Sequence, residues 1–127
     1  MKKTFSGAPW EKQVGYCRAL RVGNLIEVSG TTAMGSDNQV IGVNDIATQT
    51  KHIIETAEKS LQELGASLTH VIRTRMYTTN IALWEEIGAV HGQYFEEIQP
   101  TTTLVEVSKL IHPDLLIEIE FTAHLDV

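Results

Sequence analysis

The stretch LLIEIEFTAH, Leu115 to His124, decides the fold of this chain. Apolar side chains stand at every second position, which is the period of a β-strand and not that of a helix. Such a strand has two faces of different character. One face carries Leu115, Ile117, Ile119, Phe121 and Ala123, and the other carries Leu116, Glu118, Glu120, Thr122 and His124. The first set predicts a buried core face against which other elements pack.

Further strands are predicted from β-rich runs and from the turns that bound them. Gly23-Asn24 supplies the positive φ angles that a tight turn needs, so the runs on either side of it form a hairpin. The alternating run VIRTRMYTT also predicts a strand. Besides the last strand, the predicted strands are Cys17 to Val22, Leu25 to Ser29, Val71 to Thr79 and Thr101 to Val107, and a short extended piece is expected at Val40 to Val43.

Two helices are predicted from apolar stripes. The first runs from Asp45 to Leu64, with Asn44 or Asp45 as its cap and Gly65 ending it in the left-handed conformation. The second follows Asn80 as its cap and is closed by Pro100, because the residue before a proline resists the α conformation. The stripe of the first helix is Ile46, Ile53, Ala57, Leu61 and Leu64, with Ile54 beside them, and that of the second is Trp84, Ile87, His91, Tyr94 and Ile98.

The order strands, helix, strand, helix, strands fits two helices that cover one face of a single sheet, an α+β arrangement. With 127 residues, the chain has the size of one domain, residues 1–127. The uncovered face of the sheet is expected to carry Leu116, Glu118 and Glu120, with either Thr102 and Leu104 or their neighbours. A face that is half apolar and half charged is typical of a subunit interface with clefts, so we expect a homo-oligomer.

Composition limits the classes of partner. The net charge is -6 at pH 7, and the nearest approach to a basic cluster is two arginine pairs, Arg18 with Arg21 and Arg73 with Arg75. Two pairs do not make a nucleic-acid groove, so no nucleic acid is expected as a partner. No apolar run is long enough for a signal peptide or a membrane span, so we expect a cytoplasmic protein without a membrane partner.

Motifs for metals, nucleotides and activated nucleophiles are missing from the sequence. No two of the five histidines lie at i and i+4, and no phosphate-binding glycine pattern occurs, so neither a metal nor a cofactor is expected. Cys17 is the only cysteine and is either a packing residue or a reactive thiol. His91 lies on the predicted buried stripe, where it is either a hydrogen-bonded packing residue or part of a site.

Glu118 is the strongest candidate for chemistry. It lies between Ile117 and Ile119, and a glutamate in an apolar strand either faces water or is partly desolvated, with a raised pKa. A desolvated carboxylate can act as a general base toward a water molecule. Glu106 and Glu120 are further strand carboxylates, and the sequence alone does not choose among the three.

Six segments occur in one order along nearly the whole chain: Gly15-Tyr16, Val28-Ser29-Gly30, the helix after Asn44, the strand Val71 to Thr79, PxxxxVEV at Pro100 to Val107, and IEIE at Ile117 to Glu120. Together they resemble the reactive intermediate (imine/enamine) deaminase family, also called YjgF-like or RidA-like. The resemblance implies a chorismate-mutase-like α+β topology, a homotrimer, and small-molecule clefts between subunits. It also implies cofactor-free hydrolysis of enamines and imines, such as 2-aminoacrylate, to a keto acid and ammonia.

The resemblance assigns roles to individual positions. Glu118 corresponds to the residue that orients or activates the hydrolytic water, and Tyr16, Ser29 and Gly30 correspond to the cleft wall. Leu104 stands where the family often has a cysteine near the substrate.

Thr102 stands where the family has the arginine that forms a bidentate pair with the substrate carboxylate. Such a charge-assisted pair contributes roughly 1.5–3 kcal/mol, and a threonine hydroxyl cannot replace its fork. We therefore expect Thr102 to orient a neutral group and the protein to be a poor 2-aminoacrylate deaminase. Whether another cation replaces the anchor stays open, and the candidates are Arg18, Arg21, Arg73 and Lys109 of a neighbouring chain.

Three functions remain open at this point. The first is a deaminase or hydrolase of C=N bonds whose substrate is uncharged or anchored differently. The second is a non-catalytic protein of the same trimeric fold that binds a small metabolite. The third, the endoribonuclease or translation-inhibitor activity attributed to some relatives, is disfavoured by the acidic charge.

Overall fold

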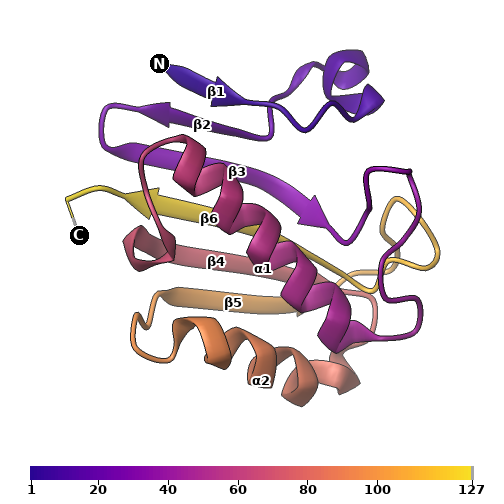
Figure 1. Ribbon diagram of the computed structural model, residues 1–127. Helices are drawn as coiled ribbons and strands as arrows, with labels where there is room; N and C mark the ends of the chain where they lie inside the picture. The colour runs from indigo at the N-terminus through magenta and orange to yellow at the C-terminus, as the bar shows by residue number, and fades with distance from the viewer. Residues whose placement is uncertain (127) are drawn as a thin grey trace.

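A six-stranded sheet forms the body of the molecule in the computed structural model, which describes residues 1–126 (Figure 1). Its order is β1-β2-β3-β6-β4-β5, and every neighbouring pair is antiparallel except β4 and β5, which are parallel. The strand that is last in the chain therefore lies in the middle of the sheet. The strands are β1 (Lys2–Thr4), β2 (Ala19–Val22), β3 (Leu25–Thr32), β4 (Val71–Thr78), β5 (Thr101–Glu106) and β6 (Ile117–His124).

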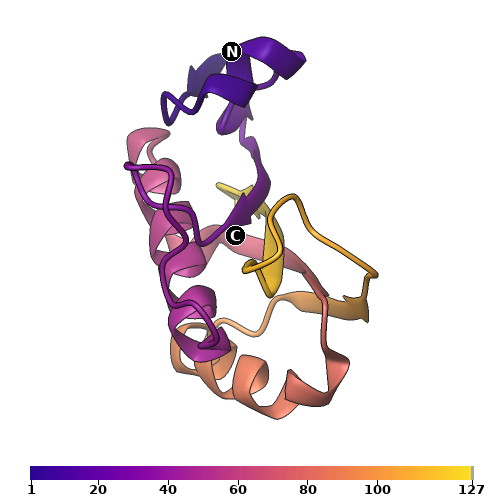
Figure 2. The same ribbon diagram turned by 90° about the vertical axis from the view of Figure 1, so that its right-hand side faces the viewer.

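Two α-helices cover one face of this sheet and leave the other face open (Figures 1 and 2). Helix α1 (Ile46–Glu63) packs over β3 and β6, and α2 (Trp84–Phe95) packs beside α1. The chain also has three short helical turns: a π-helical turn, η1 (Glu11–Gly15), and two 3₁₀ turns, η2 (Leu68–His70) and η3 (Ile81–Leu83). The predicted α+β architecture, one sheet with both helices on one face, is confirmed.

Strand β6 has the two faces that its sequence predicts. Its apolar side chains Ile117, Ile119, Phe121 and Ala123 are all 0% exposed beneath the helices. The alternate residues, among them Glu118 and Glu120, are half-buried on the open face. The strand thus contributes to the hydrophobic core and to the polar face at the same time.

Helix α1 begins and ends as its sequence predicts. The Asp45 side chain accepts a hydrogen bond from the backbone N–H of Thr48 at 3.1 Å, and Gly65 follows the helix with φ of 85°. Arg21 adds a link that the sequence does not indicate, because its Nη1 donates to the carbonyl of Leu64 at 2.9 Å. A cation at this end of a helix also complements the helix dipole.

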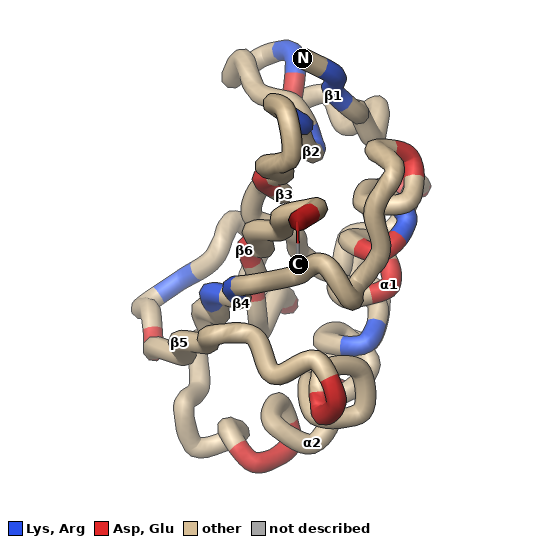
Figure 3. Tube along the Cα trace, turned by 90° about the vertical axis from the view of Figure 1, so that its left-hand side faces the viewer, with Lys and Arg blue, Asp and Glu red and all other residues tan. Residues whose placement is uncertain are grey.

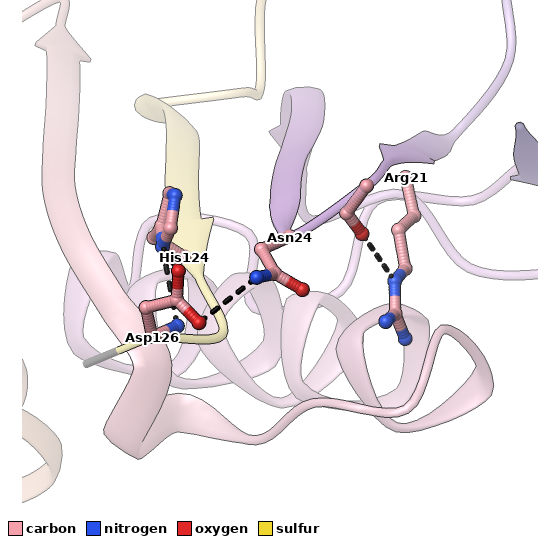
Figure 4. A network of polar contacts seen from close by, with 5 residues as sticks. Arg21, Asn24, His124 and Asp126 are labelled. Atoms are coloured by element: carbon pink, nitrogen blue, oxygen red, sulfur yellow. Dashed lines mark hydrogen bonds and ion pairs between the residues drawn. The ribbon is translucent and has the colours of Figure 1, made fainter.

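The turn between β2 and β3 binds the end of the chain (Figure 4). Asn24 Nδ2 donates to Asp126 Oδ1 at 2.8 Å, and the backbone N–H of Asp126 donates to His124 Nδ1 at 3.1 Å. Arg21 Nε donates to the carbonyl of Gly23 at 2.8 Å in the same turn. The close pair of His124 and Asp126 is therefore part of a turn and not of a catalytic constellation.

The second helical region differs from its prediction. Asn80 caps the short η3 turn, by accepting from the N–H of Ala82, and α2 begins only at Trp84. Trp84 is therefore the first residue of α2, and it is 57% exposed although the predicted stripe buries it. The buried residues of α2 are Ile87, Val90 and Phe95.

Two smaller features were also predicted incompletely. Strand β1 and the turn η1 carry no periodic sequence signal, and the extended piece expected at Val40 to Val43 is only an isolated bridge between Met34 and Val40.

Charges of both signs are interspersed along the chain (Figure 3). Arg18 precedes β2 and Arg21 lies in it, whereas Arg73 and Arg75 lie in β4, and β3 and β6 separate the two pairs. They do not form one basic stripe. Among the helices in the described chain, none combines the length and the apolar character that crossing a membrane requires.

Candidate functional site

A bulge in β3 brings Gly30 against Glu118 of β6. The register between the two strands shifts between Val28 and Thr31, so the backbone at Gly30 leaves the regular ladder. A Cβ built on Gly30 would lie 3.0 Å from Cδ of Glu118 and closer still to its Oε2. Only glycine leaves room for the carboxylate at this position.

Arg18 lies over the same bulge. Its Nη2 donates to the carbonyl of Gly30 at 2.6 Å, and its guanidinium carbon is 5.9 Å from the centre of the Tyr16 ring. The backbone at Arg18 is fixed on both sides, since its N–H donates to Thr4 and its carbonyl accepts from Ser29 at 3.0 Å. Arg18 is thus a positioned cation and not a free surface side chain.

Ser29 has a structural role in this arrangement. Its hydroxyl donates to the carbonyl of Cys17 at 2.8 Å, which links the bulge to the segment before β2. Cys17 is half-buried at that link. The bond holds Gly30 and Arg18 in register.

The environment of Glu118 raises its pKa. Desolvation by burial is the largest cause, the charge of Glu120 adds to it, and the charge of Arg18 opposes it. The Tyr16 pKa is also raised, chiefly by burial, with Arg18 opposing and Glu11 and Glu118 adding smaller effects. Tyr16, Arg18 and Glu118 therefore form one electrostatic cluster.

The hydrogen bonds of the three strand carboxylates show which of them is available for chemistry, a choice that the sequence leaves open. Glu106 accepts a hydrogen bond from the N–H of Ile81 at 3.0 Å, and Glu120 accepts one from Tyr77 Oη at 2.8 Å. Glu118 accepts none from the part of the chain that the structure describes. Its oxygens are available to bind a water molecule or a substrate proton.

Thr102 lies on the opposite face of the sheet from Glu118. Its hydroxyl is 2.7 Å from the hydroxyl of Thr74, which is 2.9 Å from Nε2 of His91 on α2. Arg73 instead contacts the hydroxyls of Thr101 and Thr103 on the open face. Of the two arrangements left open for β5, the neighbours of Thr102 and Leu104 therefore occupy the open face.

The Thr74 bond also explains His91. Burial lowers the pKa of His91, which favours a neutral ring that shares a proton with the Thr74 hydroxyl and packs on Phe95 at a centroid distance of 4.6 Å. Leu104 is partly buried against the core on the same side of the sheet. These residues have a packing role in the single chain.

One protomer therefore brings together only part of the predicted site. Tyr16, Ser29, Gly30 and Glu118 lie together at the bulge, and Arg18 joins them. Thr102 of β5 pairs with Thr74 of β4, and Thr74 pairs in turn with Phe121 of β6. Phe121 lies three residues from Glu118, a distance of about 10 Å along the strand. Within one chain, the bulge cluster and Thr102 cannot hold the same small molecule.

Arg18 is one of the four cations that the sequence offers as replacements for the anchoring arginine of the family, and the sequence alone does not choose among them. The structure uses Arg21 at the end of α1 and Arg73 beside β5, whereas Arg18 contacts the bulge. Its separation of two residues from Tyr16 places both on one face of an extended segment, a signal present in the sequence.

A cavity of about 420 Å³ adjoins Arg18. Its walls are loop 6–10, the end of β3 with the loop after it, and Thr56 of α1. This volume lies in the range of small-molecule sites. Within residues 1–126, no group of three or more His, Cys, Asp and Glu side chains is placed to hold a metal ion.

Comparison with known proteins agrees with this architecture. The family model described as Endoribonuclease L-PSP matches residues 8–125. The crystal structure of Rv2704 from Mycobacterium tuberculosis, a member of the YjgF/YER057c/UK114 family, is 45% identical, covers 97% of this chain and 98% of its own, and superposes with a TM-score of 0.88.

Two curated relatives are similar at lower identity. The 3-aminoacrylate deaminase RutC of Acinetobacter baylyi is 36% identical over 87% of this chain and 86% of its own length. A RutC family protein of Pyrococcus abyssi is 37% identical over 89% of each chain. Since the family model spans nearly all of the chain and both relatives exceed 30% identity over most of it, the chain belongs to the YjgF-like family described by the Endoribonuclease L-PSP model.

Proposed function

We propose that this protein hydrolyses small imines or enamines without a cofactor, in clefts between the subunits of a homotrimer, with Glu118 as the catalytic base. The observation that carries the proposal is the state of Glu118. It is a half-buried carboxylate with a raised pKa, held over Gly30, and it accepts no hydrogen bond from the described chain. Carboxylates tuned in this way are typical of general bases.

The reaction needs only water and a proton carrier. Glu118 takes a proton from water as the water oxygen forms a bond to the imine carbon, and the nitrogen takes up a proton from solvent as the C=N double bond becomes single. The protonated Glu118 then gives its proton to the departing nitrogen, and the C–N bond breaks as the new hydroxyl group loses its proton to solvent, so a carbonyl compound and ammonia leave. An enamine enters the same path after a proton is added to its β-carbon.

Family membership supports this chemistry. The relative from Acinetobacter baylyi is named a 3-aminoacrylate deaminase, and 3-aminoacrylate is an enamine. The open, half-polar face of the sheet supports an assembly of subunits, because such a face is poorly suited to remain in water. A cleft between protomers would also let Thr102 of one chain approach Glu118 of another.

The test compares the hydrolysis of two imines that other enzymes generate in the reaction mixture. An amino-acid oxidase acting on leucine supplies an imine with a carboxylate, and an amine oxidase acting on benzylamine supplies a neutral one. Semicarbazide condenses faster with an imine than with the carbonyl compound that hydrolysis gives, so hydrolysis appears as a slower initial formation of semicarbazone. We expect the wild-type chain to lower that initial rate for at least one imine, and Glu118→Gln to reduce the effect about 100-fold or more.

Glu27→Gln is the matched control. Glu27 is an exposed strand carboxylate on β3, so its substitution removes the same charge without touching the bulge. No effect of the wild-type chain on either imine, or full activity in Glu118→Gln, contradicts the proposal.

Thr102 favours a second candidate, a non-catalytic protein that binds a small metabolite in the same clefts. Its support is the missing family arginine, without which the usual substrate is held less tightly. Ligand binding without hydrolysis of either imine is the result that selects it.

A further inference from the structure

The Tyr77 hydroxyl binds a residue other than the one opposite it in the sheet. The register of β4 and β6 sets Tyr77 opposite Glu118 and Arg75 opposite Glu120. The hydroxyl instead donates diagonally to Oε1 of Glu120 at 2.8 Å. An aromatic side chain is long enough to reach such a diagonal neighbour on the same face of an antiparallel pair. The hydrolysis described above gives no role to this hydrogen bond.

Arg75 is the cation that could have taken Glu120 as a partner. It lies directly opposite Glu120, yet the two form no ion pair within residues 1–126, where the ion pair present is that of His124 with Asp126. The hydrogen bond to Glu120 raises the pKa of Tyr77, and the charge of Arg75 opposes this effect. A neutral hydroxyl therefore holds the Glu120 carboxylate in place and leaves its negative charge without an ion-pair partner.

Glu118 is the group on which this charge acts. Glu118 and Glu120 are two residues apart in β6, so they point to the same face and are separated by about 7 Å along the strand. After burial, the charge of Glu120 is the second cause of the raised pKa of Glu118. A carboxylate with a higher pKa is a stronger base toward water. Fixing Glu120 thus also fixes the strength of the base.

The other elements packed around Glu118 do not supply a second charge of this sign. Arg18 opposes the effect of Glu120, and β3 sets the uncharged Thr32 opposite Glu118. The nearest titratable and charged groups are Glu120 on β6, Tyr77 and Arg75 on β4, Glu27 on β3, and Tyr16 and Arg18 before β2. Among them, Glu120 is the one whose charge raises the pKa of Glu118.

We propose that Tyr77 is a positioning residue of the hydrolytic site, which acts through Glu120 to keep a second negative charge beside the Glu118 base. Tyr77 itself touches neither the water nor the substrate. Without its hydroxyl, Glu120 can turn toward Arg75, and the charge beside Glu118 is then compensated. The catalytic consequence rests on the proposed function, whereas the coupling of Tyr77 to Glu118 through Glu120 does not.

The coupling is measured by ¹³C NMR titration of the Glu118 side-chain carboxyl, whose signal is assigned with Glu118→Gln. Because the loss of a like charge favours the ionised form, Glu120→Gln is expected to raise the proton dissociation constant of Glu118 about threefold or more. Tyr77→Phe should act in the same direction. When Tyr77→Phe is added to Glu120→Gln, no further change is expected, since the residue through which Tyr77 acts has lost its charge.

Tyr94→Phe is the matched control. The Tyr94 hydroxyl donates to Glu55 at 3.1 Å, between α2 and α1, so this variant loses the same kind of bond on the other face of the sheet. The Glu118 titration is expected to be the same in Tyr94→Phe as in the wild type.

The pH profile of imine hydrolysis separates positioning from a general loss of structure. In Tyr77→Phe, the weaker base is expected to lower kcat/KM about two- to fivefold at high pH. At the acid end, a larger fraction of Glu118 is ionised in this variant, so its kcat/KM is expected to exceed that of the wild type. The two profiles should therefore cross, whereas damaged packing would lower activity at every pH.

The positioning role and the proposed function fail in different ways. An unmoved Glu118 titration in Tyr77→Phe, or a further shift when Tyr77→Phe is added to Glu120→Gln, overturns the positioning role. If the titrations shift as expected but neither imine is hydrolysed, the hydrolase function is wrong and the coupling stands. If an imine is hydrolysed through Glu118 and the profiles of wild type and Tyr77→Phe coincide, the positioning role is wrong and the hydrolase function stands.

Discussion

Gly30 and Glu118 form a pair in which one residue makes room for the other. The φ angle of Gly30 is not among the positive values, so the need for glycine comes from space and not from backbone conformation. We expect Gly30→Ala to displace the Glu118 carboxylate and reduce imine hydrolysis at least tenfold, with a much smaller effect on thermal unfolding. Full activity in Gly30→Ala would show that Glu118 is not held there for catalysis.

The raised pKa of Glu118 predicts how activity depends on pH. Glu118 must be ionised to accept a proton, so kcat/KM is expected to rise with pH through a pKa above the ordinary glutamate value of 4.5. An acid limb at or below the ordinary value would contradict this assignment.

Stability gives an independent check with a defined sign. Because the folded-state pKa is raised, ionising Glu118 costs the folded chain more than the unfolded chain, and stability is lost as pH rises from the ordinary value through the raised pKa. In urea unfolding across that window, Glu118→Gln should gain stability relative to wild type as the pH rises.

Thr102 predicts a limit on substrate range. We expect little acceleration of 2-aminoacrylate hydrolysis by the wild-type chain, measured as pyruvate release. Thr102→Arg should create or raise that activity about tenfold or more, whereas Thr102→Lys, a charge without the planar fork, should do less. No gain in a Thr102→Arg variant that keeps the wild-type oligomeric state would mean that more than the anchor differs from the family.

At the level of single residues, the sequence predicts features that depend on neighbouring residues better than features that depend on how the strands pair. The position of Glu118 between isoleucines left open whether its carboxylate faces water or is partly desolvated, and the structure shows a half-buried carboxylate with a raised pKa. The face occupied by Thr102 depends on the register of β5 against β4, which pairs Thr102 with Thr74 and which no local pattern specifies. Arg18 became distinct from the other cations only once β2 and β3 were placed side by side.

Helix α2 offers a test at the level of elements. Gly88 lies in its exposed part, and a Cβ built there meets nothing within 4 Å. Since glycine costs a helix interior about 1 kcal/mol relative to alanine, Gly88→Ala should raise the free energy of unfolding by about that amount. Chemical denaturation measures it, and unchanged imine hydrolysis is the control that separates this variant from Gly30→Ala. A destabilised Gly88→Ala would indicate an unrecognised contact at that position.

Elements with a long period or a clear cap were predicted well. Helix α1 has its cap at Asp45 and its left-handed ending at Gly65 where the sequence indicates them. Strand β1, by contrast, is three residues long and exists only through its pairing with β2, so no periodicity within it could reveal it. The η3 turn was missed because the Asn80 cap is the same for both helix types.

The whole molecule predicts an assembly. The helix-free face carries exposed Val105 beside half-buried polar residues of β6, and members of this family are expected to bury it in a homotrimer. Light scattering coupled to size-exclusion chromatography should give a mass three times the 14.1 kDa of one chain. A monomer at micromolar concentration would contradict this assembly and the clefts that depend on it.

The central position of β6 has a consequence for how the chain acquires its structure during synthesis. On one side of β6 lie β1, β2 and β3, on the other lie β4 and β5, and apart from β6 no strand pairs the two groups. Because β6 leaves the ribosome after the other strands, the nascent chain holds two partial sheets with unpaired edges until residues 117–124 emerge. The sheet can close only after β6 has emerged, and until then the exposed edges of β3 and β4 are the surfaces most open to pairing with another chain.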